Sequence, residues 1–167
     1  MWSLTSIGLS DDEYMQAGEV ADVIPPEDRT CLANAARARV LNHKDWLLYN
    51  NQREILRYEW REFFENWDVI LCPTYSTPAF SHDHRPFEQR THLVDGASLE
   101  YFQPMFWAAI STLCYLPSTV FPVGLSLDGK PIGLQAISAE YNDYTSLAFV
   151  RLLTQHLGGF APPYAFE

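Results

Sequence analysis

The sequence predicts an α/β fold in which helices pack on a few strands of a mixed sheet. In residues 45–66, apolar side chains recur at three- and four-residue spacing, which is typical of an amphipathic helix. The spacing then changes, because residues 69–71 form a short apolar run that is closely followed by a proline, as in a buried strand. Asp128-Gly129 lies between two alternating apolar runs, and this pattern is a strong signal for a β-hairpin at about residues 119–138.

The register of this hairpin depends on its turn. A two-residue type I′ turn places Phe121 opposite Ala136 on a face that we expect to be buried, and Gly124 opposite Gly133 on the other face. Glycine within a strand often marks a bulge or the close approach of a ligand or another backbone. Pro122 removes a backbone donor, so we also expect a bend or an interruption. Two interpretations stay open: a distorted edge hairpin that packs on a helix, or a strand pair that faces a ligand.

Four more helices and one long connection complete the expected elements. The pattern predicts helices at residues 11–24, 29–42, 100–115 and 142–156. Apolar residues cover a wide arc of the last helix, so we expect it to be mostly buried. Residues 74–99 are polar and irregular, and we expect a long loop there.

The composition restricts the kind of partner. Aromatic residues make up 14% of the 167 residues, which is high for an independent domain of this size. Either the core is unusually aromatic, or something else covers part of this surface. The net charge of −10 argues against nucleic acid and anionic membranes as partners, since phosphate groups are bound by clustered Lys and Arg. No stretch approaches the length of a membrane span, and no secretory signal precedes the first helix.

The three cysteines are Cys31, Cys72 and Cys114. Their wide spacing, their odd number and the lack of a CxxC pair argue against a disulfide framework. We therefore predict a reducing compartment and a cytoplasmic location.

A histidine-rich stretch is the only candidate for a metal site. His82, Asp83 and His84 lie close to Glu88 and His92 in the sequence. In an extended loop, side chains at i and i+2 point the same way, so two imidazoles can share a metal, but the remaining ligands lack a fixed spacing. A solvated polar loop is the preferred interpretation, and we predict no metal and no cofactor.

Nucleophilic residues give no stronger signal. Cys72 and Cys114 both lie in apolar stretches, where a cysteine usually acts as an inert core residue. The residue types of a Ser-His-Asp triad are all present, but the sequence has no GxSxG elbow, no GxGxxG and no phosphate-binding loop. The residues alone indicate a scaffold with a bare glycine patch and no convincing catalytic group.

The order and spacing of several segments resemble the amidase signature family, from about residue 20 to the end of the chain. The segments are HKDW at 43–46, DVILCP at 68–73, Asp95-Gly96, Tyr101, Trp107, LPSTVFPVG at 116–124, DGKPIGLQ at 128–135 and GFAPP at 159–163.

The resemblance implies an enzyme that hydrolyses or transfers carboxamides with a serine nucleophile, a second serine in a cis peptide and a lysine base, without a metal. The glycine/serine-rich stretch that holds both serines has no counterpart here, and the two lysines, Lys44 and Lys130, match other positions of the family. Family chains are well over twice as long. Residues 1–167 therefore resemble a single unit, the C-terminal third of an amidase domain without its N-terminal catalytic part, and no catalytic residue is predicted.

The resemblance also implies a role in the complete enzyme. This third supplies sheet strands behind the catalytic centre and part of the pocket, and the predicted substrate-binding residues are Tyr101, Trp107, Gly124 and Gly133. The apolar residues at 102–107 favour an aromatic or aliphatic amide as the small-molecule substrate. The expected partners are an N-terminal amidase chain or a second copy. Three interpretations remain: a fragment of an amide hydrolase, a subunit that completes one, and a non-catalytic binding or accessory module.

Overall fold

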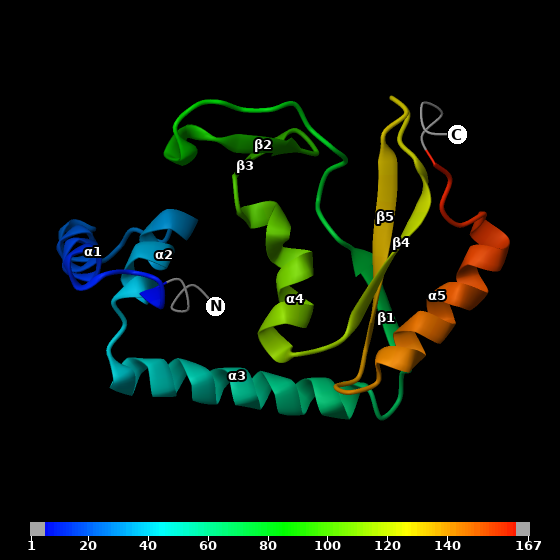
Figure 1. Ribbon diagram of the computed structural model, residues 1–167, viewed down its shortest axis with the longest axis horizontal. Coiled ribbons are helices and arrows are strands. Elements are labelled where there is room, and N and C mark those ends of the chain that lie inside the picture. The colour runs from blue at the N-terminus through cyan, green and yellow to red at the C-terminus, as the bar shows by residue number, and fades with distance from the viewer. Residues whose placement is uncertain (1–5, 163–167) are drawn as a thin grey trace. The chain divides into compact units, whose positions relative to one another are not determined.

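The computed structural model describes residues 6–162, which form an α/β structure as predicted (Figure 1). The chain divides into two compact units. Unit 1 comprises Met1–Arg53 and Arg85–Gln103, and unit 2 comprises Glu54–His84 and Pro104–Glu167.

Unit 1 begins with two helices in which side chains accept hydrogen bonds from backbone N–H groups of the first turn. α1 (Asp11–Val23) starts with a capping box formed by Ser10 and Glu13. The first backbone N–H of α2 (Cys31–Arg39) donates a hydrogen bond to Glu100 Oε2 at 2.7 Å. Such acceptors satisfy N–H groups that have no partner within the helix, and a carboxylate also interacts favourably with the helix dipole.

A small hairpin in unit 1 was missed by the sequence analysis. β2 (Thr91–Val94) and β3 (Ala97–Glu100) pair antiparallel, and a short 3₁₀-helix (Phe87–Gln89) precedes them. Asp95 and Gly96 connect the strands with φ of 49° and 80°, as a two-residue type I′ turn requires. The predicted loop is therefore wrong for this part, because strands of only four residues each, half of them polar, give little periodic signal.

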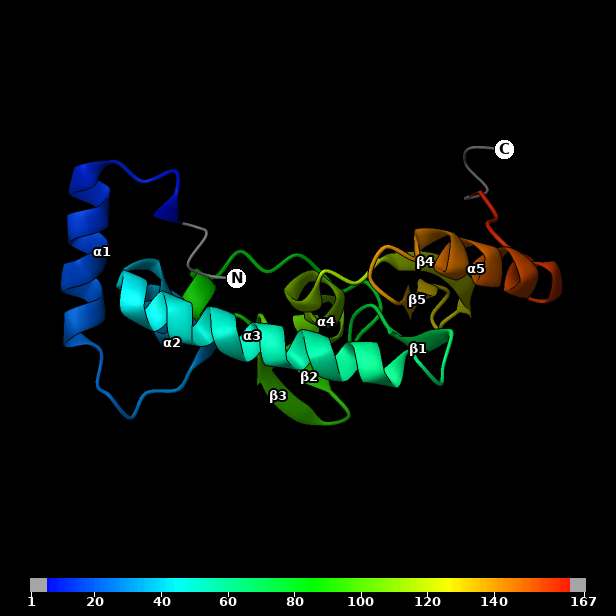
Figure 2. The ribbon, with the colours of Figure 1, turned by 90° about the horizontal axis from the view of Figure 1, so that it is seen from below.

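α3 (His43–Phe63) is one continuous helix whose first half belongs to unit 1 and whose second half, from Glu54, belongs to unit 2 (Figure 2). Its C-terminal end is aromatic, as predicted. The rings of Trp60 and Phe64 stack at 5.8 Å between centroids, and both pack on the core of unit 2.

Unit 2 contains a three-stranded sheet. β1 (Val69–Pro73) and β4 (Ser118–Leu125) flank β5 (Pro131–Ser138), in the order β1-β5-β4. The predicted strand and the hairpin at about 119–138 are both confirmed. Every described strand pair is antiparallel, where a mixed sheet was expected.

The turn of the β4–β5 hairpin differs from the prediction. Among the turn residues, Gly129 has a positive φ of 79°, whereas Asp128 does not have a positive φ, so the turn is not type I′. The Ser126 N–H donates to the Lys130 carbonyl at 2.8 Å, and the Gly129 N–H donates to the Ser126 carbonyl at 2.9 Å. These bonds close a three-residue loop that ends in a left-handed glycine, another common hairpin connection.

The register changes as a consequence. Phe121 pairs with Leu134 rather than with Ala136, and a bulge lies between Pro122 and Gly124. The predicted Gly124–Gly133 pair is therefore wrong: Gly124 lies opposite Ile132, and Gly133 lies opposite Pro122. A longer turn and a bulge each shift the pairing by one residue, and sequence alternation alone does not reveal either shift.

Helices cover both faces of this sheet (Figure 1). α4 (Phe106–Cys114) and the second half of α3 pack on one face, and α5 (Asp143–Leu157) packs on the other. The core on the α4 side comprises Cys72, Cys114, Leu116 and Ile137, with Leu56, Trp60, Phe64, Ile70, Trp107 and Ile110 around them. The core on the α5 side comprises Phe121, Ala136 and Val150, with Val123, Leu134, Phe149 and Leu153 around them.

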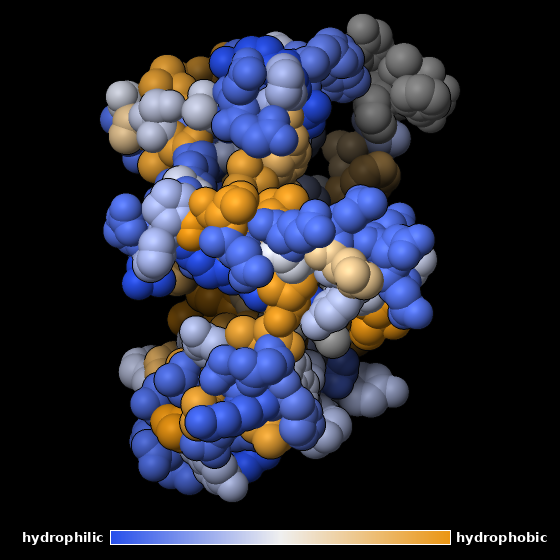
Figure 3. Space-filling model, turned by 90° about the vertical axis from the view of Figure 1, so that its left-hand side faces the viewer, coloured by the Kyte–Doolittle hydropathy of each residue, from blue (hydrophilic) through white to orange (hydrophobic). Residues whose placement is uncertain are grey.

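Two predicted helices differ from their observed form. The helix predicted at 100–115 begins only at Phe106, after a 3₁₀-helix (Gln103–Met105) that contains Pro104. The last helix was expected to be mostly buried, but only Ser146 and Val150 are buried. Its outer side carries the exposed apolar residues Tyr144, Leu147 and Leu152, which are 87%, 51% and 62% exposed. Exposed apolar residues also occur among hydrophilic ones on the face shown in Figure 3.

Candidate functional site

The predicted site residues fall in both units. Tyr101 belongs to unit 1, and Trp107, Gly124 and Gly133 belong to unit 2. The Tyr101 ring stacks on buried His92 at 4.9 Å between centroids and lies edge-on to Phe87 at 5.2 Å. Tyr101 is thus part of an aromatic cluster that orders the segment around β2 and β3.

Trp107 lies at the start of α4 and is fixed there by Gln135 of β5. The Gln135 side-chain amide donates to the Trp107 carbonyl at 2.9 Å and to the Pro73 carbonyl at 3.0 Å. Its carbonyl oxygen accepts the Ser118 hydroxyl at 2.8 Å. Because Gln135 is only 2% exposed, these bonds satisfy a buried amide and join β1, β4, β5 and α4 at one point.

The two glycines have different surroundings. Gly124 has a φ of 147°, which side chains rarely tolerate, and a Cβ added there would meet nothing within 4 Å. A Cβ at Gly133 would lie 3.3 Å from the Phe121 carbonyl oxygen and 3.6 Å from Val120 Cγ1. Gly124 therefore serves the bulge, whereas Gly133 allows close packing within the hairpin.

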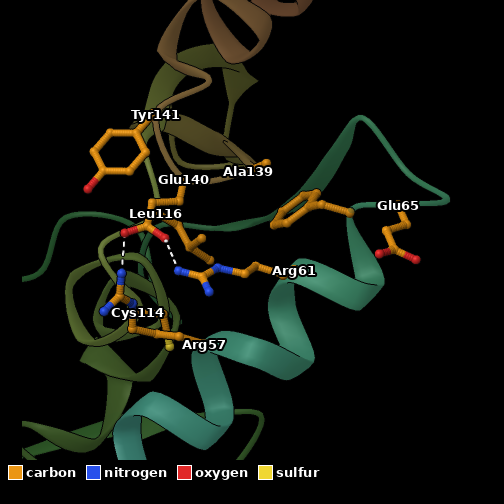
Figure 4. A pocket seen from close by; sticks show the side chains of 9 residues that line it. Arg57, Arg61, Glu65, Cys114, Leu116, Ala139, Glu140 and Tyr141 are labelled. Carbon is orange, nitrogen blue, oxygen red and sulfur yellow. Dashed lines mark hydrogen bonds and ion pairs between the residues drawn. The ribbon is translucent and has the colours of Figure 1, made fainter.

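A pocket of about 280 Å³ lies in unit 2 (Figure 4). Its lining includes Arg57 and Arg61 of α3, Cys114 at the end of α4, and Glu140 and Tyr141 after β5. Both arginines point toward Glu140 in Figure 4. Arg57 makes a hydrogen-bonded ion pair with Glu140, and the Arg61 Nη2–Glu140 Oε2 distance is 3.1 Å.

The charges of this pocket hold Glu140 in its ionised form. The hydrogen bond from Arg61 and the charge of Arg57 lower the Glu140 pKa. Arg57 also donates to both carboxylate oxygens of Glu54, at 2.9 and 2.8 Å, and its guanidinium lies 5.1 Å from the centroid of the Tyr115 ring. A carboxylate bound in this way is a poor general base, so the cluster mainly fastens the segment after β5 to α3.

Neither the thiols nor the histidines form a reactive centre. Cys72 and Cys114 are 5% and 1% exposed, as predicted for core residues, and burial raises the pKa of the Cys72 thiol. His82 and His84 have ring centroids 6.1 Å apart. Within residues 6–162, no three His, Cys, Asp or Glu side chains are placed to hold a metal ion together. The helices of that range also include none that is both long and apolar enough to cross a membrane.

The sequence analysis missed Gln135 and the Arg57–Glu140 pair. Gln135 could have been found from the sequence, because it is a polar residue in the middle of a mostly apolar strand, where a buried side chain needs hydrogen-bond partners. The Arg57–Glu140 pair joins positions 83 residues apart, and no local pattern indicates such a contact.

Fold and site together define an α/β scaffold whose sheet is held by the hydrogen bonds of Gln135. Its buried cysteines, Cys72 and Cys114, are core residues rather than activated nucleophiles. The chain belongs to the amidase family, whose model, described as Amidase, matches residues 25–147. The resemblance found in the sequence is thereby confirmed.

Named relatives agree with this assignment. The chain is 31% identical over 131 residues to an indoleacetamide hydrolase of Bradyrhizobium diazoefficiens, covering 75% of this chain and 23% of the relative. It is 30% identical over 112 residues to fatty-acid amide hydrolase 2-A of Danio rerio, covering 67% of this chain and 19% of the relative. A solved structure described as an amidase has a TM-score of 0.62 at 21% identity, covering 87% of this chain and 33% of that protein. The chain thus spans about a fifth to a third of the proteins that it matches.

Proposed function

We propose that the chain supplies sheet scaffold and part of the substrate pocket of an amidase-type amide hydrolase. In this proposal it is not catalytic alone, because the serines and the lysine of the family come from the amidase part that the chain does not represent. One observation carries the proposal: 87% of the chain has the fold of a solved amidase, yet it corresponds to only 33% of that protein.

The proposed pocket wall is the start of α4. Phe106 is 62% exposed and lies edge-on to Trp107, with ring centroids 5.3 Å apart, so an aromatic surface is available at this position. Such a surface favours an aromatic or aliphatic amide over a charged one. The names of the two relatives above denote hydrolases of indoleacetamide and of fatty-acid amides, which belong to these classes.

A complementation assay tests the proposal. The chain is mixed with the Bradyrhizobium indoleacetamide hydrolase from which the segment aligned with this chain has been deleted, and ammonia release from indoleacetamide is measured. We expect release from the mixture and none from either component alone. A second run uses a long-chain fatty-acid amide. An inactive mixture with both amides, despite two folded components, would contradict the proposal.

Trp107→Ala tests the pocket wall within the same assay. We expect at least a tenfold lower kcat/KM for indoleacetamide, since even one missing methylene contact in a hydrophobic pocket is worth about 1–3 kcal/mol and the indole ring is much larger. Trp67→Ala is the matched control, because Trp67 is 63% exposed and lies outside α4. Equal losses of kcat/KM in the two variants would show that Trp107 does not line the pocket.

The competing proposal is a free-standing binding or accessory module. It requires a stable monomer that does not expose extensive apolar surface, whereas Tyr144, Leu147 and Leu152 of α5 are all exposed. Weak binding of a hydrophobic dye by a monomeric chain would favour the module.

The proposed cytoplasmic location rests only on the three free cysteines.

A further inference from the structure

The first turn of α4 has no side-chain cap of its own. Met105, the residue before the helix, makes no side-chain hydrogen bond to this turn, and no acidic residue lies in it. α4 has only nine residues, and helices of this length are marginal in water without tertiary contacts. The position of Phe106 and Trp107 at its start therefore depends on contacts with other elements.

Contacts from β5 and from the loop after β1 hold this start in place. The Trp107 side chain packs against the core on the α4 side, and its carbonyl accepts a hydrogen bond from the Gln135 side chain at 2.9 Å. The Ser76 hydroxyl, after β1, donates to the Pro104 carbonyl at the longer distance of 3.5 Å. The Gln135 bond is the shorter of these two polar contacts, and it acts on a residue of the first turn itself.

The Gln135 side chain is suited to this contact by its two donors and its acceptor. Its amide nitrogen donates one hydrogen to the Trp107 carbonyl and the other to the Pro73 carbonyl, which lies at 3.0 Å. Because carbonyl oxygens can only accept, the amide has a single orientation, and its own oxygen accepts the Ser118 hydroxyl. One nitrogen thereby sets the spacing between the end of β1 and the start of α4.

We propose that Gln135 is a positioning residue for substrate selection, because it holds the aromatic start of α4 where a large apolar group of the amide binds. The inference rests on the proposed function, in which this start is a pocket wall. The rings of Phe106 and Trp107 belong to neighbouring residues, so a shift of the first turn moves both. Gln135 itself is only 2% exposed, so it acts through Trp107 rather than by touching the substrate.

This role separates large amides from small ones. The indole ring of indoleacetamide is large enough to use an aromatic wall, whereas the ethyl group of propionamide offers little surface for such a contact. A displaced wall therefore weakens the binding of indoleacetamide much more than that of propionamide. A merely structural role of Gln135 would instead lower the amount of active enzyme, which affects both amides equally.

Kinetics of the complementation mixture test the inference. Gln135→Met keeps the length of the side chain without a donor, and Gln135→Glu keeps the length and the acceptor oxygen. We expect the ratio of kcat/KM for indoleacetamide to that for propionamide to fall about tenfold in Gln135→Met and about threefold in Gln135→Glu, through a higher KM for indoleacetamide. Gln155→Met, at an exposed position of α5, is the matched control and should leave the ratio unchanged.

The outcomes for the inference and for the proposed function differ. An unchanged ratio in either folded Gln135 variant, or a lower kcat at an unchanged KM, would overturn the inference and leave the proposed function intact. A mixture that contains the unaltered chain and hydrolyses neither indoleacetamide nor a fatty-acid amide would overturn both.

Hydrogen exchange of the unaltered full chain gives a second test that needs neither a variant nor a partner. In a helix that starts at Phe106, the Ser111 N–H donates to the Trp107 carbonyl. Since Gln135 holds that carbonyl, we expect the Ser111 amide to exchange roughly a hundredfold more slowly than in an unstructured chain. Exchange at the unstructured rate would show that the start of α4 is not held, and would overturn the inference whatever the kinetics of amide hydrolysis.

Discussion

The two β-hairpins within residues 6–162 carry the same dipeptide, Asp-Gly, in their turns, yet the dipeptide has a different role in each. In the β2–β3 hairpin, Asp95 and Gly96 both have positive φ and form the whole connection. In the β4–β5 hairpin, only Gly129 of the corresponding pair has positive φ, and the loop has three residues.

The stabilisation of the two hairpins differs in the same way. The short β2–β3 pair depends on a turn that fixes its register and on the stacking of His92 on Tyr101. The β4–β5 pair is twice as long and is fastened by buried contacts, above all by Gln135. The turn therefore contributes to the register of both hairpins, but in the longer one a bulge shifts the pairing again and buried side-chain contacts hold the strands together.

The largest expected effect on stability comes from removing the buried hydrogen bonds of Gln135. Gln135→Leu leaves the Pro73 and Trp107 carbonyls and the Ser118 hydroxyl without this partner, so we expect a loss of about 3 kcal/mol in the free energy of unfolding. Urea unfolding followed by circular dichroism measures it. Gln155→Leu, on the exposed side of α5, is the control and should have little effect. Similar losses in both variants would show that Gln135 is not the anchor of the hairpin.

The bulge is the second test. Gly124→Ala forces a side chain into a backbone with φ of 147°, and we expect a loss of about 2 kcal/mol. Gly133→Ala is the comparison, because its Cβ would only press against the Phe121 carbonyl oxygen at 3.3 Å, with an expected loss of about 1 kcal/mol. A larger loss at Gly133 would mean that close packing within the hairpin contributes more to its stability than the bulge does.

We expect low pH to weaken the ion pairs that attach the segment after β5 to α3. Since Arg61 and Arg57 lower the Glu140 pKa, the ionised carboxylate stabilises the fold at neutral pH. This contribution is complete above the unfolded pKa of about 4.3 and is lost as the pH falls through the lower folded pKa. We expect Glu140→Gln to cost about 2 kcal/mol at pH 7, and the difference from the unaltered chain to shrink below about pH 4.3.

Glu65→Gln is the control for this measurement, because Glu65 lines the same pocket. Urea unfolding at several pH values measures both variants. A difference between Glu140→Gln and the unaltered chain that stays constant from neutral to acidic pH would contradict the assignment to the Glu140 carboxylate.

The smallest effects are expected at the turns. Asp95→Ala places alanine at φ of 49° and should cost about 1 kcal/mol, because left-handed backbone is unfavourable for alanine. Asp128→Ala should cost less, because Asp128 does not have a positive φ and its contacts with Ser126 and Lys130 are exposed. Unfolding midpoints of the two variants decide the order, and the reverse order would contradict the different roles of the two turns.

The strongly periodic parts of the fold were predictable from the sequence. The apolar run at β1, the amphipathic pattern of α3 and the hairpin at 119–138 all reflect local periodicity. The register was not predictable, because a three-residue loop and a bulge each move the pairing by one position. The β2–β3 hairpin was missed because its strands have only four residues each, too few for a clear alternation of apolar and polar residues.

The candidate site was less predictable than the fold. Tyr101, Trp107, Gly124 and Gly133 remain predictions that rest on the family resemblance and the hairpin pattern. The contacts that order their surroundings join distant positions, such as Arg57 with Glu140, and only the tertiary fold brings these positions together. The exposed side of α5 was also unexpected, since an apolar arc indicates burial without specifying what covers it.

The position of β1 in the sheet has a consequence for synthesis. Gln135 contacts Pro73 across 62 positions of sequence, whereas β4 and β5 are neighbours along the chain. Contacts that are local in sequence form early, so the β4–β5 hairpin should assemble before β1 joins it. At a ribosomal rate of about 5–20 residues per second, β1 is made roughly 3–12 s before its partner strand. During that interval its apolar run has no partner in this sheet, so chaperone binding should be strongest at residues 69–73.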